Sequence, residues 1–507
     1  MIRITYQVGG RIMELHLSKS KYCNAVQCPK MLWMKKNKPE EFDESVMNQV
    51  ILDNGSEVGD LAMGLFGEYV EVPFDRDLGK MIKKTEELLE TGTPIICEAS
   101  FTYDGLFCSV DILKNLGGHR VELYEVKSST EEKPIYQHDV AYQVYVLTKL
   151  GFTVERACLV HLNNQYFRHG DLDLQQLFHI VDLTAKARSM QPDVEHNLEV
   201  FATYLSRPDE PTDDLNPGCF DPYPCGFWKY CSRNLPKPNV FDLRGPHKST
   251  KLKYYYQGLI SFADLNGSDR LNANTYQQVE HELYDYPPAI KVDTIKTFLS
   301  RLSYPLYFLD FETFSPAIPL YDDSNPYAKI PFQYSLHWIE QEGGELKHTE
   351  YLAYPGKDPR RELAERLCRD IPMDVCTTAY NMSFEKNVIK GLAALYPDLA
   401  DHLMNIHDHI EDLMIPFKER WYYSRAMQGS YSIKYVLPAL YPDDPTLDYH
   451  NLEGVHNGGE AMDVFQKIAS MPTEELETWR KHLLKYCELD TYAMVKVWEK
   501  LKELVNE

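Results

Sequence analysis

The sequence predicts a mixed α/β protein with two domains and a connector between them. A chain of 507 residues is longer than one hydrophobic core usually supports, so two domains are expected. The chain is 44% apolar and 12% aromatic, which is typical of a folded globular protein. Strand-like runs and helical runs both occur in each half, which indicates sheets covered by helices. We divide the chain into residues 1–235, 236–300 and 301–507.

Composition and charge narrow the classes of function. No apolar run reaches the length of about 18 residues that is needed to cross a bilayer, and the first residues lack the apolar core of a signal peptide. We therefore expect a cytoplasmic protein with no membrane partner. The net charge of −23 argues against a protein that coats nucleic acid non-specifically, because its field repels phosphate. It does not exclude a nuclease, since the carboxylates of a metal site add negative charge of their own.

The first half predicts a sheet with helices around it. Two short turns, Asp104-Gly105 and Gly117-Gly118, favour strands that follow one another directly. The helices are expected from apolar periodicity and from the glycine that closes one of them. The expected elements are a helix, three strands, a helix, a strand and a helix, at residues 80–90, 95–103, 106–113, 121–127, 138–150, 157–162 and 174–185.

Charged residues stand inside two of these apolar strands. Asp111 lies in the second strand, and Glu125 and Lys127 lie in the third, where alternation places both side chains on one face. Unpaired burial of these charges would be costly. A metal ion held by Asp111 and Glu125, with Lys127 positioning or activating a water against a phosphodiester, would account for them. A solvent-facing strand with an ion pair is the alternative.

Eleven cysteines occur in the chain, and three of them are evenly spaced. Cys219, Cys225 and Cys231 have five residues between successive members and stand among Pro and Gly. Cys28 lies near the other end of the same half. Four thiolates suit zinc or an iron–sulfur cluster. Cys23 is an alternative to Cys28, and unrelated buried thiols are the alternative to a metal site.

Because of these acids and cysteines, the stretch of about residues 15–235 resembles the PD-(D/E)xK nucleases of the RecB class that carry a four-cysteine iron–sulfur clasp. The resemblance implies a restriction-endonuclease-like core in which Asp111, Glu125 and Lys127 form the D…ExK motif. It implies that Gln143 is the motif glutamine of the following helix, and that Asp111 and Glu125 hold one or two metal ions. It also implies a [4Fe–4S] cluster, with Zn²⁺ as the alternative, on Cys28, Cys219, Cys225 and Cys231.

The connector is expected to be helical, and the second half, like the first, is expected to combine strands and helices. Residues 236–300 open with a Pro-rich, mixed-charge stretch and continue with short amphipathic segments, so we expect a helical linker. The second half predicts three strands, a helix, a strand and two further helices, the last of them long. These elements are expected at residues 306–311, 332–339, 349–354, 360–370, 375–380, 385–395 and 473–504.

Acidic residues stand at defined points of these elements. Asp310 and Glu312 lie two residues apart near the end of the first strand, so they share a face. Two carboxylates held this close repel each other, and a bound divalent cation relieves the repulsion. Glu385 opens the helix after the fourth strand. Tyr486 and Asp490 are four residues apart and share one face of the last helix.

In this order the acids resemble the three motifs of the DnaQ-like DEDD exonucleases, which have a ribonuclease H-like fold. The likeness covers about residues 300–507. D-x-E corresponds to Asp310 and Glu312, and Y-x-x-x-D corresponds to Tyr486 and Asp490, the tyrosine subtype. In N-x-x-F-D the chain has Glu385 in place of the final Asp.

The resemblance implies two Mg²⁺ or Mn²⁺ ions about 3.5–4 Å apart that activate a water and stabilise the leaving oxygen. Asp310 would lie between the ions, and Tyr486 would orient the attacking water. The remaining metal ligands would be Glu312, Glu385 and Asp490. Asp412 is the alternative acid of the second motif, and Lys434 is a candidate contact to the nucleic-acid backbone.

The whole chain resembles a two-domain bacterial family that joins a RecB-like nuclease to a DnaQ-like exonuclease. The expected function is metal-dependent hydrolysis of DNA, 3′–5′ in the second domain, in repair or in defence against foreign DNA. The chain has no G-x-x-x-x-G-K-[ST] loop, so a helicase or another repair or defence protein would supply unwinding. The alternatives are an RNA exonuclease and a degenerate module that binds nucleic acid or a partner without cutting. Two departures favour the degenerate module: Gly59 stands where the first family often has a metal-binding His, and Glu385 replaces an Asp.

Overall fold

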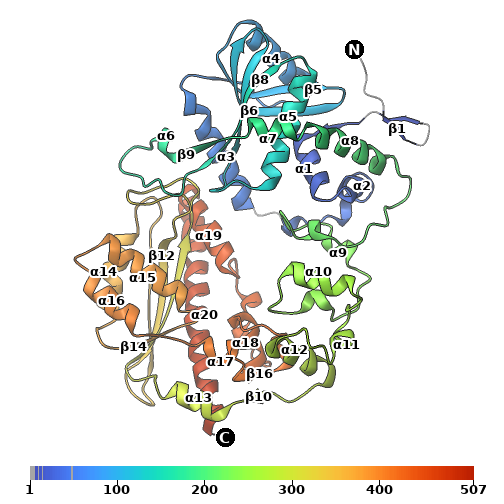
Figure 1. Ribbon diagram of the computed structural model, residues 1–507. Helices are drawn as coiled ribbons and strands as arrows, with labels where there is room; N and C mark the ends of the chain where they lie inside the picture. Colours follow the sequence, from blue (N-terminus) through green and yellow to red (C-terminus); the bar gives the residue numbers. More distant parts are fainter. Residues whose placement is uncertain (1–5, 9–10, 14, 47–48, 507) are drawn as a thin grey trace. The chain divides into compact units, whose positions relative to one another are not determined.

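The computed structural model describes residues 6–8, 11–13, 15–46 and 49–506. The chain folds into two compact units, Met1–Asn234 with Pro316–Tyr327 and Leu235–Ser315 with Ala328–Glu507, called unit 1 and unit 2 below (Figure 1). Both units contain a sheet and helices, which confirms the mixed α/β class expected from the sequence. Among the described residues, no helix has the length and apolar character that crossing a membrane requires.

The centre of unit 1 is a seven-stranded sheet. β5, β6 and β7 are antiparallel neighbours, β8 is parallel to β7, and β9 is antiparallel to β8. The turn between β5 and β6 has φ values of 49° at Asp104 and 80° at Gly105, as a tight Asp-Gly hairpin requires. The strands in spatial order are β4 (Val70–Glu71), β5 (Ile95–Tyr103), β6 (Leu106–Gly117), β7 (Arg120–Lys127), β8 (Thr153–Leu162) and β9 (Phe178–Asp182), with β3 (Leu17–Ser18) beside β6.

Helices cover both faces of this sheet. Leu113 and Leu123 pack in a core with α5, whereas their neighbours Ile112 and Tyr124 pack in a separate core with α3, as strand alternation requires. α5 also contacts α1, α7 and α8. The helices of unit 1 are α1 (Lys19–Gln27), α2 (Lys30–Asn37), α3 (Gln49–Met63), α4 (Leu78–Glu90), α5 (Pro134–Lys149), α6 (Leu174–Leu177), α7 (Thr184–Ser189), α8 (Gln191–Ser206) and α9 (Trp228–Cys231).

The prediction of one helix over residues 174–185 is wrong. α6 ends at Leu177, and the chain continues as β9, which pairs with β8 along the sheet edge. Leu177 and Phe178 are buried in the core that contains α3. Pairing with β8 gives the backbone of Phe178–Asp182 its hydrogen bonds, so the tertiary partner outweighed the helical spacing of the apolar residues.

Residues 316–327, which connect β11 to β12, pack within unit 1. Arg168 Nη1 donates to the carbonyl oxygens of Pro319 (3.0 Å) and Leu320 (3.1 Å). The backbone N–H of Gly170 donates to Asp322 Oδ1 at 2.7 Å. Ala317 is buried in the core around α3. This segment therefore belongs to the fold of unit 1 although it lies between two strands of unit 2.

The centre of unit 2 is a five-stranded sheet. β11, β12 and β13 are antiparallel, and β14 and β15 run parallel to β11. β11 is the middle strand, and every one of its residues except Asp310 is buried, which explains its nearly continuous apolar run. The spatial order is β13 (Leu346–Leu352), β12 (Ile330–Ile339), β11 (Leu306–Phe314), β14 (Cys376–Ala379) and β15 (Ile410–Asp412).

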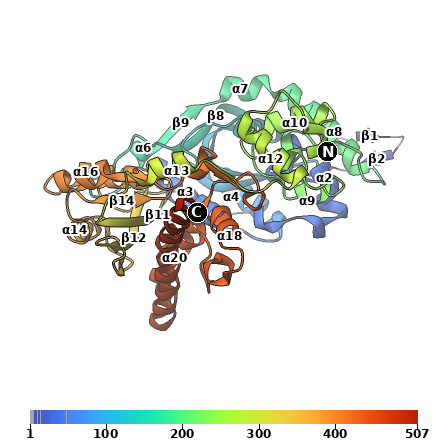
Figure 2. The same cartoon turned by 90° about the horizontal axis from the view of Figure 1, so that it is seen from below.

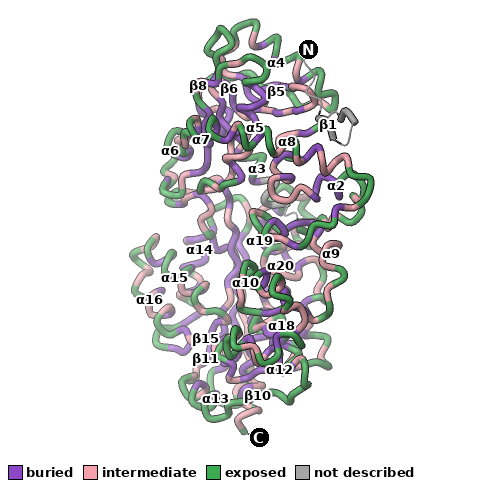
Figure 3. Tube along the Cα trace, turned by 45° about the vertical axis from the view of Figure 1, so that its right-hand side comes forward, coloured by how far each residue is buried: buried purple, intermediate pink, exposed green. Residues whose placement is uncertain are grey.

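The sheet of unit 2 lies between α20 on one face and α14, α15 and α16 on the other (Figures 1 and 2). Phe308 packs with Trp498 of α20, whereas the Tyr334 hydroxyl donates to Asp370 of α14. Figure 3 shows the strands mostly buried and the outer helical surfaces exposed. The remaining main elements of unit 2 are α10 (Lys248–Tyr256), α11 (Phe262–Leu265), α12 (Ala273–Tyr284), α13 (Val292–Leu299), α14 (Arg360–Asp370), α15 (Ser383–Leu395), α16 (Ala400–Asp408), α17 (Ile415–Lys418), α18 (Ile433–Leu440), α19 (Gly458–Lys467) and α20 (Thr473–Asn506), with β10 (Ala289–Ile290) paired to β16 (Tyr422–Tyr423).

Candidate functional site

Three carboxylates meet between β11 and α20 in unit 2. Asp310 and Glu312 come from β11 and Asp490 comes from α20, and one oxygen of each lies within 4.8 Å of the others. Glu312 and Asp490 are each only 8% exposed. The Cys487 thiol of α20 donates to Asp310 Oδ2 at 3.8 Å, so Asp310 faces the helix. The structure thus brings together three of the four acids that the sequence placed in one site.

Burial and mutual repulsion control the protonation of this group. Burial raises the pKa of Asp310 and of Glu312 well above the usual range, and the Asp490 carboxylate raises both further. Burial also raises the pKa of Asp490 to about 6, against the effect of the Tyr449 hydroxyl, which donates to Asp490 Oδ1 at 2.7 Å. Three buried carboxyl groups that raise one another's pKa form an arrangement that a bound cation would relieve.

Glu385 lies in the first turn of α15, outside the group of three. Its side chain is 2% exposed, and its Oε2 has no hydrogen-bond partner in the described part of the chain. Burial raises the pKa of Glu385 to about 8, and the carboxylates of Asp412 and Asp490 add to the shift. The alternative acid, Asp412, accepts the backbone N–H groups of Asn381 (3.0 Å) and Met414 (2.9 Å) on one oxygen. Asp412 therefore holds the turn that precedes α15.

Two tyrosines and a lysine adjoin the carboxylates. Tyr486 is 4% exposed, and its ring centroid is 6.1 Å from that of Tyr449. Lys434 Nζ lies 5.4 Å from the Tyr449 ring and 5.8 Å from the Tyr486 ring. Its charge lowers the pKa values of Glu312 and Asp490. Sequence reasoning missed Tyr449, because no spacing pattern connects it to Asp490.

A cavity of about 1020 Å³ adjoins this site and includes Lys434 and Tyr449 in its lining. Acidic side chains also line it, and their charge opposes the entry of an anion. The start of α19 comes equally close to the carboxylates: a Cβ on Gly458 would lie 3.3 Å from Glu312 Oε2. Glycine at this position therefore leaves room for the Glu312 carboxylate. The acidic residues that line the cavity are Asp443, Asp444, Asp448 and Glu460.

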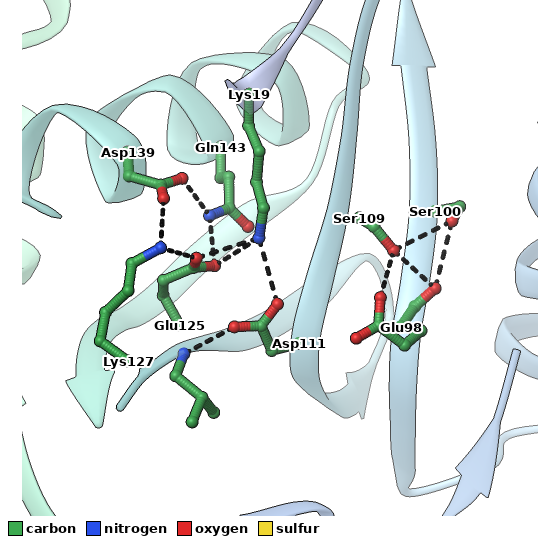
Figure 4. A network of polar contacts seen from close by, with 10 residues as sticks. Lys19, Glu98, Ser100, Ser109, Asp111, Glu125, Lys127, Asp139 and Gln143 are labelled. Carbon is green, nitrogen blue, oxygen red and sulfur yellow. Dashed lines mark hydrogen bonds and ion pairs between the residues drawn. The ribbon is translucent and has the colours of Figure 1, made fainter. Parts of the chain in front are cut away.

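In unit 1, the expected acids form a network with two lysines (Figure 4). Lys19 Nζ donates to Asp111 Oδ1 at 3.1 Å and to Glu125 Oε2 at 2.8 Å. Lys127 Nζ donates to Glu125 Oε1 at 2.6 Å and to Asp139 Oδ2 at 2.7 Å. Lys19, the first residue of α1, thus lies between the two carboxylates that the sequence assigned to a metal.

Gln143 completes the network from α5. Its Nε2 donates to Glu125 Oε2 at 2.7 Å and to Asp139 Oδ1 at 3.0 Å. The structure therefore brings Asp111, Glu125, Lys127 and Gln143 together, as the resemblance implied, and adds Lys19 and Asp139. Asp139 stands four residues before Gln143, so a shared helical face was a signal that could have found it. Lys19 is remote in sequence and gave no such signal.

Charge balance sets the protonation of the unit 1 network. Burial and the Glu125 carboxylate raise the pKa of Asp111 to about 7. Burial acts to raise the pKa of Glu125 as well, but the ammonium groups of Lys127 and Lys19 outweigh it and hold that pKa below its usual range. With Asp139 the network has three carboxyl groups and two ammonium groups. When all of them are ionised the network has one excess negative charge, which agrees with the raised pKa of Asp111 and of Asp139.

Four cysteines line one small cavity of about 20 Å³ in unit 1. Asn216 donates its backbone N–H to Cys219 Sγ at 3.5 Å and its side-chain amide to Cys28 Sγ at 3.9 Å. Burial raises the pKa of Cys225 to about 11, and the thiols of Cys28 and Cys231 add to the shift. The four expected ligands, Cys28, Cys219, Cys225 and Cys231, thus lie together.

Cys23, the alternative ligand, lies elsewhere in unit 1. It packs against the core that contains α1 and α5. Its pKa is raised by burial and then by the Asp139 carboxylate, which places it near the acid–lysine network. Among the described residues, the groups of three ligand atoms that lie within 4.8 Å of one another contain no cysteine.

The fold and the site define a mixed α/β protein with a buried carboxylate group suited to divalent cations. Residues 307–432 match a family described as a domain of unknown function (DUF2779); this stretch includes Asp310, Glu312 and Glu385. An uncharacterized protein of Mycoplasma genitalium is 24% identical over an alignment of 234 residues, and the match covers 41% of this chain and 33% of that protein. The match thus spans about a third of the relative's length. No solved structure matches the chain significantly.

Proposed function

We propose that unit 2 is a metal-dependent phosphodiesterase, a DnaQ-like 3′–5′ exonuclease that acts on DNA in repair or in defence against foreign DNA. The observation that carries the proposal is the buried group of Asp310, Glu312 and Asp490, whose oxygens lie within 4.8 Å of one another. Oxygen ligands are those that Mg²⁺ and Mn²⁺ prefer. The strand directions support the proposal, because three antiparallel strands, a parallel fourth strand and a closing helix follow the order of the ribonuclease H-like exonucleases.

When bound, two such ions would lower the pKa of a water and neutralise charge on the leaving oxygen. Tyr486, next to the carboxylates, would orient the attacking water. Tyr449 holds Asp490 in place through its 2.7 Å hydrogen bond. Lys434, which lines the adjoining cavity, would contact a phosphate of the nucleic acid. The metal ligands would be Asp310, Glu312, Glu385 and Asp490.

For unit 1 we propose a RecB-like PD-(D/E)xK core with a [4Fe–4S] cluster on its four cysteines. Hydrogen bonds from Asn216 to two of the sulfurs suit metal-bound thiolates. The Lys19 ammonium, 2.8 Å from Glu125 and 3.1 Å from Asp111, competes with a metal for the same carboxylates. This observation favours a unit that binds nucleic acid over a second nuclease.

Digestion of labelled oligonucleotides by the full chain tests the assignment to unit 2. We expect stepwise loss of 3′ nucleotides from single-stranded DNA in Mg²⁺ or Mn²⁺, and none in EDTA. Asp310→Asn and Asp490→Asn should each reduce the rate by at least about a thousandfold, because each removes a metal ligand. Glu503→Gln, an exposed position of the same helix α20, and Lys127→Met in unit 1 should leave the rate unchanged.

Each other outcome of this assay has a defined meaning. Digestion that survives Asp310→Asn and Asp490→Asn would contradict the proposed site. Digestion of RNA alone would replace DNA as the substrate. Binding of oligonucleotides without digestion in any divalent metal would establish the degenerate alternative. Loss of digestion in Lys127→Met alone would move the activity to unit 1.

A further inference from the structure

A second set of possible metal ligands lies on another face of α20, outside the site described above. His337 of β12 and His348 of β13 are directly opposite each other in the sheet, with ring centroids 4.3 Å apart. Glu488 of α20 faces them, and one ligand atom of each of the three residues lies within 4.8 Å of the others. His337 is 5% exposed, and the His348 side chain is 25% exposed.

Two hydroxyl groups hold the imidazole rings. His337 Nδ1 lies 2.7 Å from Thr491 Oγ1, and His348 Nε2 lies 3.0 Å from Ser335 Oγ. The two hydroxyl oxygens are 2.7 Å apart, and Thr491 donates to the Glu488 carbonyl oxygen at 3.2 Å. The network therefore connects both rings to the helix that carries Glu488.

The hydroxyl protons determine which ring nitrogens remain open. A hydroxyl has one proton to donate, and Thr491 gives its proton to the Glu488 carbonyl. When Ser335 in turn donates to Thr491, both hydroxyl oxygens accept from the rings, and this arrangement protonates His348 on Nε2 and His337 on Nδ1. The lone pairs of this tautomer pair lie on His348 Nδ1 and His337 Nε2, the two nitrogens that these hydrogen bonds do not use.

Burial favours the neutral form of both rings. It lowers the pKa of His337 to about 4, with a further contribution from His348, and it lowers the pKa of His348 as well. The Glu488 carboxylate is held from the solvent side by Lys485, whose Nζ lies 2.9 Å from Glu488 Oε2. Two neutral imidazoles and one carboxylate form a donor set for a borderline transition-metal ion.

We propose that His337, His348 and Glu488 bind a zinc ion at a site separate from the carboxylates of Asp310, Glu312 and Asp490. Imidazole nitrogens suit Zn²⁺, whereas Mg²⁺ and Ca²⁺ prefer oxygen ligands. In metal sites the second ring nitrogen of a ligating His usually donates to a fixed acceptor, as Thr491 and Ser335 provide here. The three residues leave a fourth tetrahedral position for water.

The zinc ion would join β12 and β13 to α20. Glu488 stands two residues before Asp490 and two after Tyr486, so a metal that fixes Glu488 also fixes the position of α20 along the sheet. The ion is therefore a positioning element for the carboxylate site, with no step in hydrolysis. The inference does not depend on the proposed exonuclease activity, because its ligands and its metal differ.

Metal content of the full chain tests the proposal. Purified protein is treated with EDTA, dialysed, loaded with Zn²⁺ in excess Mg²⁺ and analysed by mass spectrometry of the metals. Because the four cysteines can also take zinc, the measured quantity is the difference between variants. We expect His348→Gln and Glu488→Gln each to hold one zinc equivalent fewer than the parent, or to bind it at least a hundredfold more weakly. Asp310→Asn, Glu503→Gln and the exposed His169→Gln should keep that equivalent.

Cobalt distinguishes this site from the cysteines. Co²⁺ at His337, His348 and Glu488 should give visible absorption without the near-ultraviolet band of thiolate-to-cobalt charge transfer, and His348→Gln should remove that absorption. Zinc should also raise the melting temperature of the parent by more than that of His348→Gln, in which only the cysteines can still take zinc. Equal zinc content in the parent and both variants, or cobalt spectra with only thiolate bands, would overturn the proposal. If His337→Gln fails to fold, the less buried His348 and Glu488 still decide the question.

Discussion

Glu385 places an ionisable group in α15 where ionisation is costly. Its side chain is 2% exposed, Oε2 has no hydrogen-bond partner in the described chain, and burial raises its pKa from 4.5 to about 8. The folded protein therefore holds this proton more tightly than the unfolded chain does. Without metal, the contribution of Glu385 to stability is greatest below pH 4.5. It falls as the pH rises between the two pKa values and is lost above about 8.

Glu385→Gln should remove this pH dependence. In EDTA at about pH 9 we expect the variant to be more stable than the parent by about 3–5 kcal/mol, and at about pH 4 the two should be equal. Urea denaturation across this pH range measures the difference. Glu503→Gln, an exposed position in unit 2, serves as the control. Parallel stability curves for parent and Glu385→Gln would show that Glu385 is ionised in the folded protein.

Lys19 is a second residue with a measurable electrostatic role. Its ammonium contacts Asp111 and Glu125, and the network of three carboxyl groups and two ammonium groups has one excess negative charge when all are ionised. Replacing Lys19 by a divalent ion would make the network neutral. Lys19→Met should therefore raise the affinity of unit 1 for Mn²⁺ by at least about tenfold.

Titration calorimetry with Mn²⁺ in an Asp310→Asn background, which weakens binding in unit 2, measures this gain. Lys21→Met changes an exposed lysine of the same helix and should have no effect. Equal Mn²⁺ affinity with and without Lys19 would mean that the ammonium does not compete with a metal, and unit 1 would again be a candidate nuclease.

At the scale of elements, sequence patterns predicted the structure correctly where residues close in sequence determine the backbone geometry. The helix expected at 360–370 coincides with α14, and the Asp-Gly turn adopts the expected hairpin conformation. The helix expected from residue 138 begins earlier, because Pro134 suits a first helical position. The strand β9 was missed, because its conformation depends on pairing with β8.

The same distinction applies to the candidate site. Asp310 and Glu312 could be placed from strand alternation, and Asp490 from a recurring motif. Lys19 and Tyr449 could not, because each meets its acid only through the tertiary fold, across 92 residues in one case and 41 in the other. Sequence spacing therefore predicts the acids and omits the groups that neutralise or hydrogen-bond them.

The start of α19 gives a prediction at this scale. A Cβ on Gly458 would approach Glu312 Oε2 to 3.3 Å, so Gly458→Ala should displace the carboxylate without unfolding the protein. We expect about a tenfold loss of Mn²⁺ affinity and of digestion rate, since small displacements at a reacting centre are costly. Gly391→Ala, in open space on α15, should keep both and add up to about 1 kcal/mol of stability. Unchanged metal affinity in Gly458→Ala would count against Glu312 as a metal ligand.

At the scale of the whole molecule, the division into units constrains how function can be assigned. Residues 316–327 belong to unit 1 through Arg168 and the buried Ala317. A truncated chain that starts near residue 235 would leave this segment without its packing partners. Substitutions in the full chain are therefore the appropriate way to silence either unit. Because the net charge of −23 repels phosphate, we expect any contact with nucleic acid to be local and to require divalent cations.

The four cysteines give the last prediction, which concerns how the two ends of unit 1 are held together. Cys28 precedes the strands β4 to β9 of unit 1, whereas Cys219, Cys225 and Cys231 follow them, and all four line one cavity. A cluster across them closes a loop of about 190 residues, which by analogy with a disulfide stabilises the fold by on the order of 5 kcal/mol.

Cys28→Ser and Cys231→Ser should therefore lose iron, sulfide and visible absorption, and should lower the midpoint temperature of one of two calorimetric transitions. Metal-dependent digestion by unit 2 should persist. Cys368→Ser, a single thiol in α14, should change none of these. Unchanged iron content in both variants would exclude an iron–sulfur cluster at these cysteines, and loss of zinc instead of iron would identify zinc as the ion that they hold.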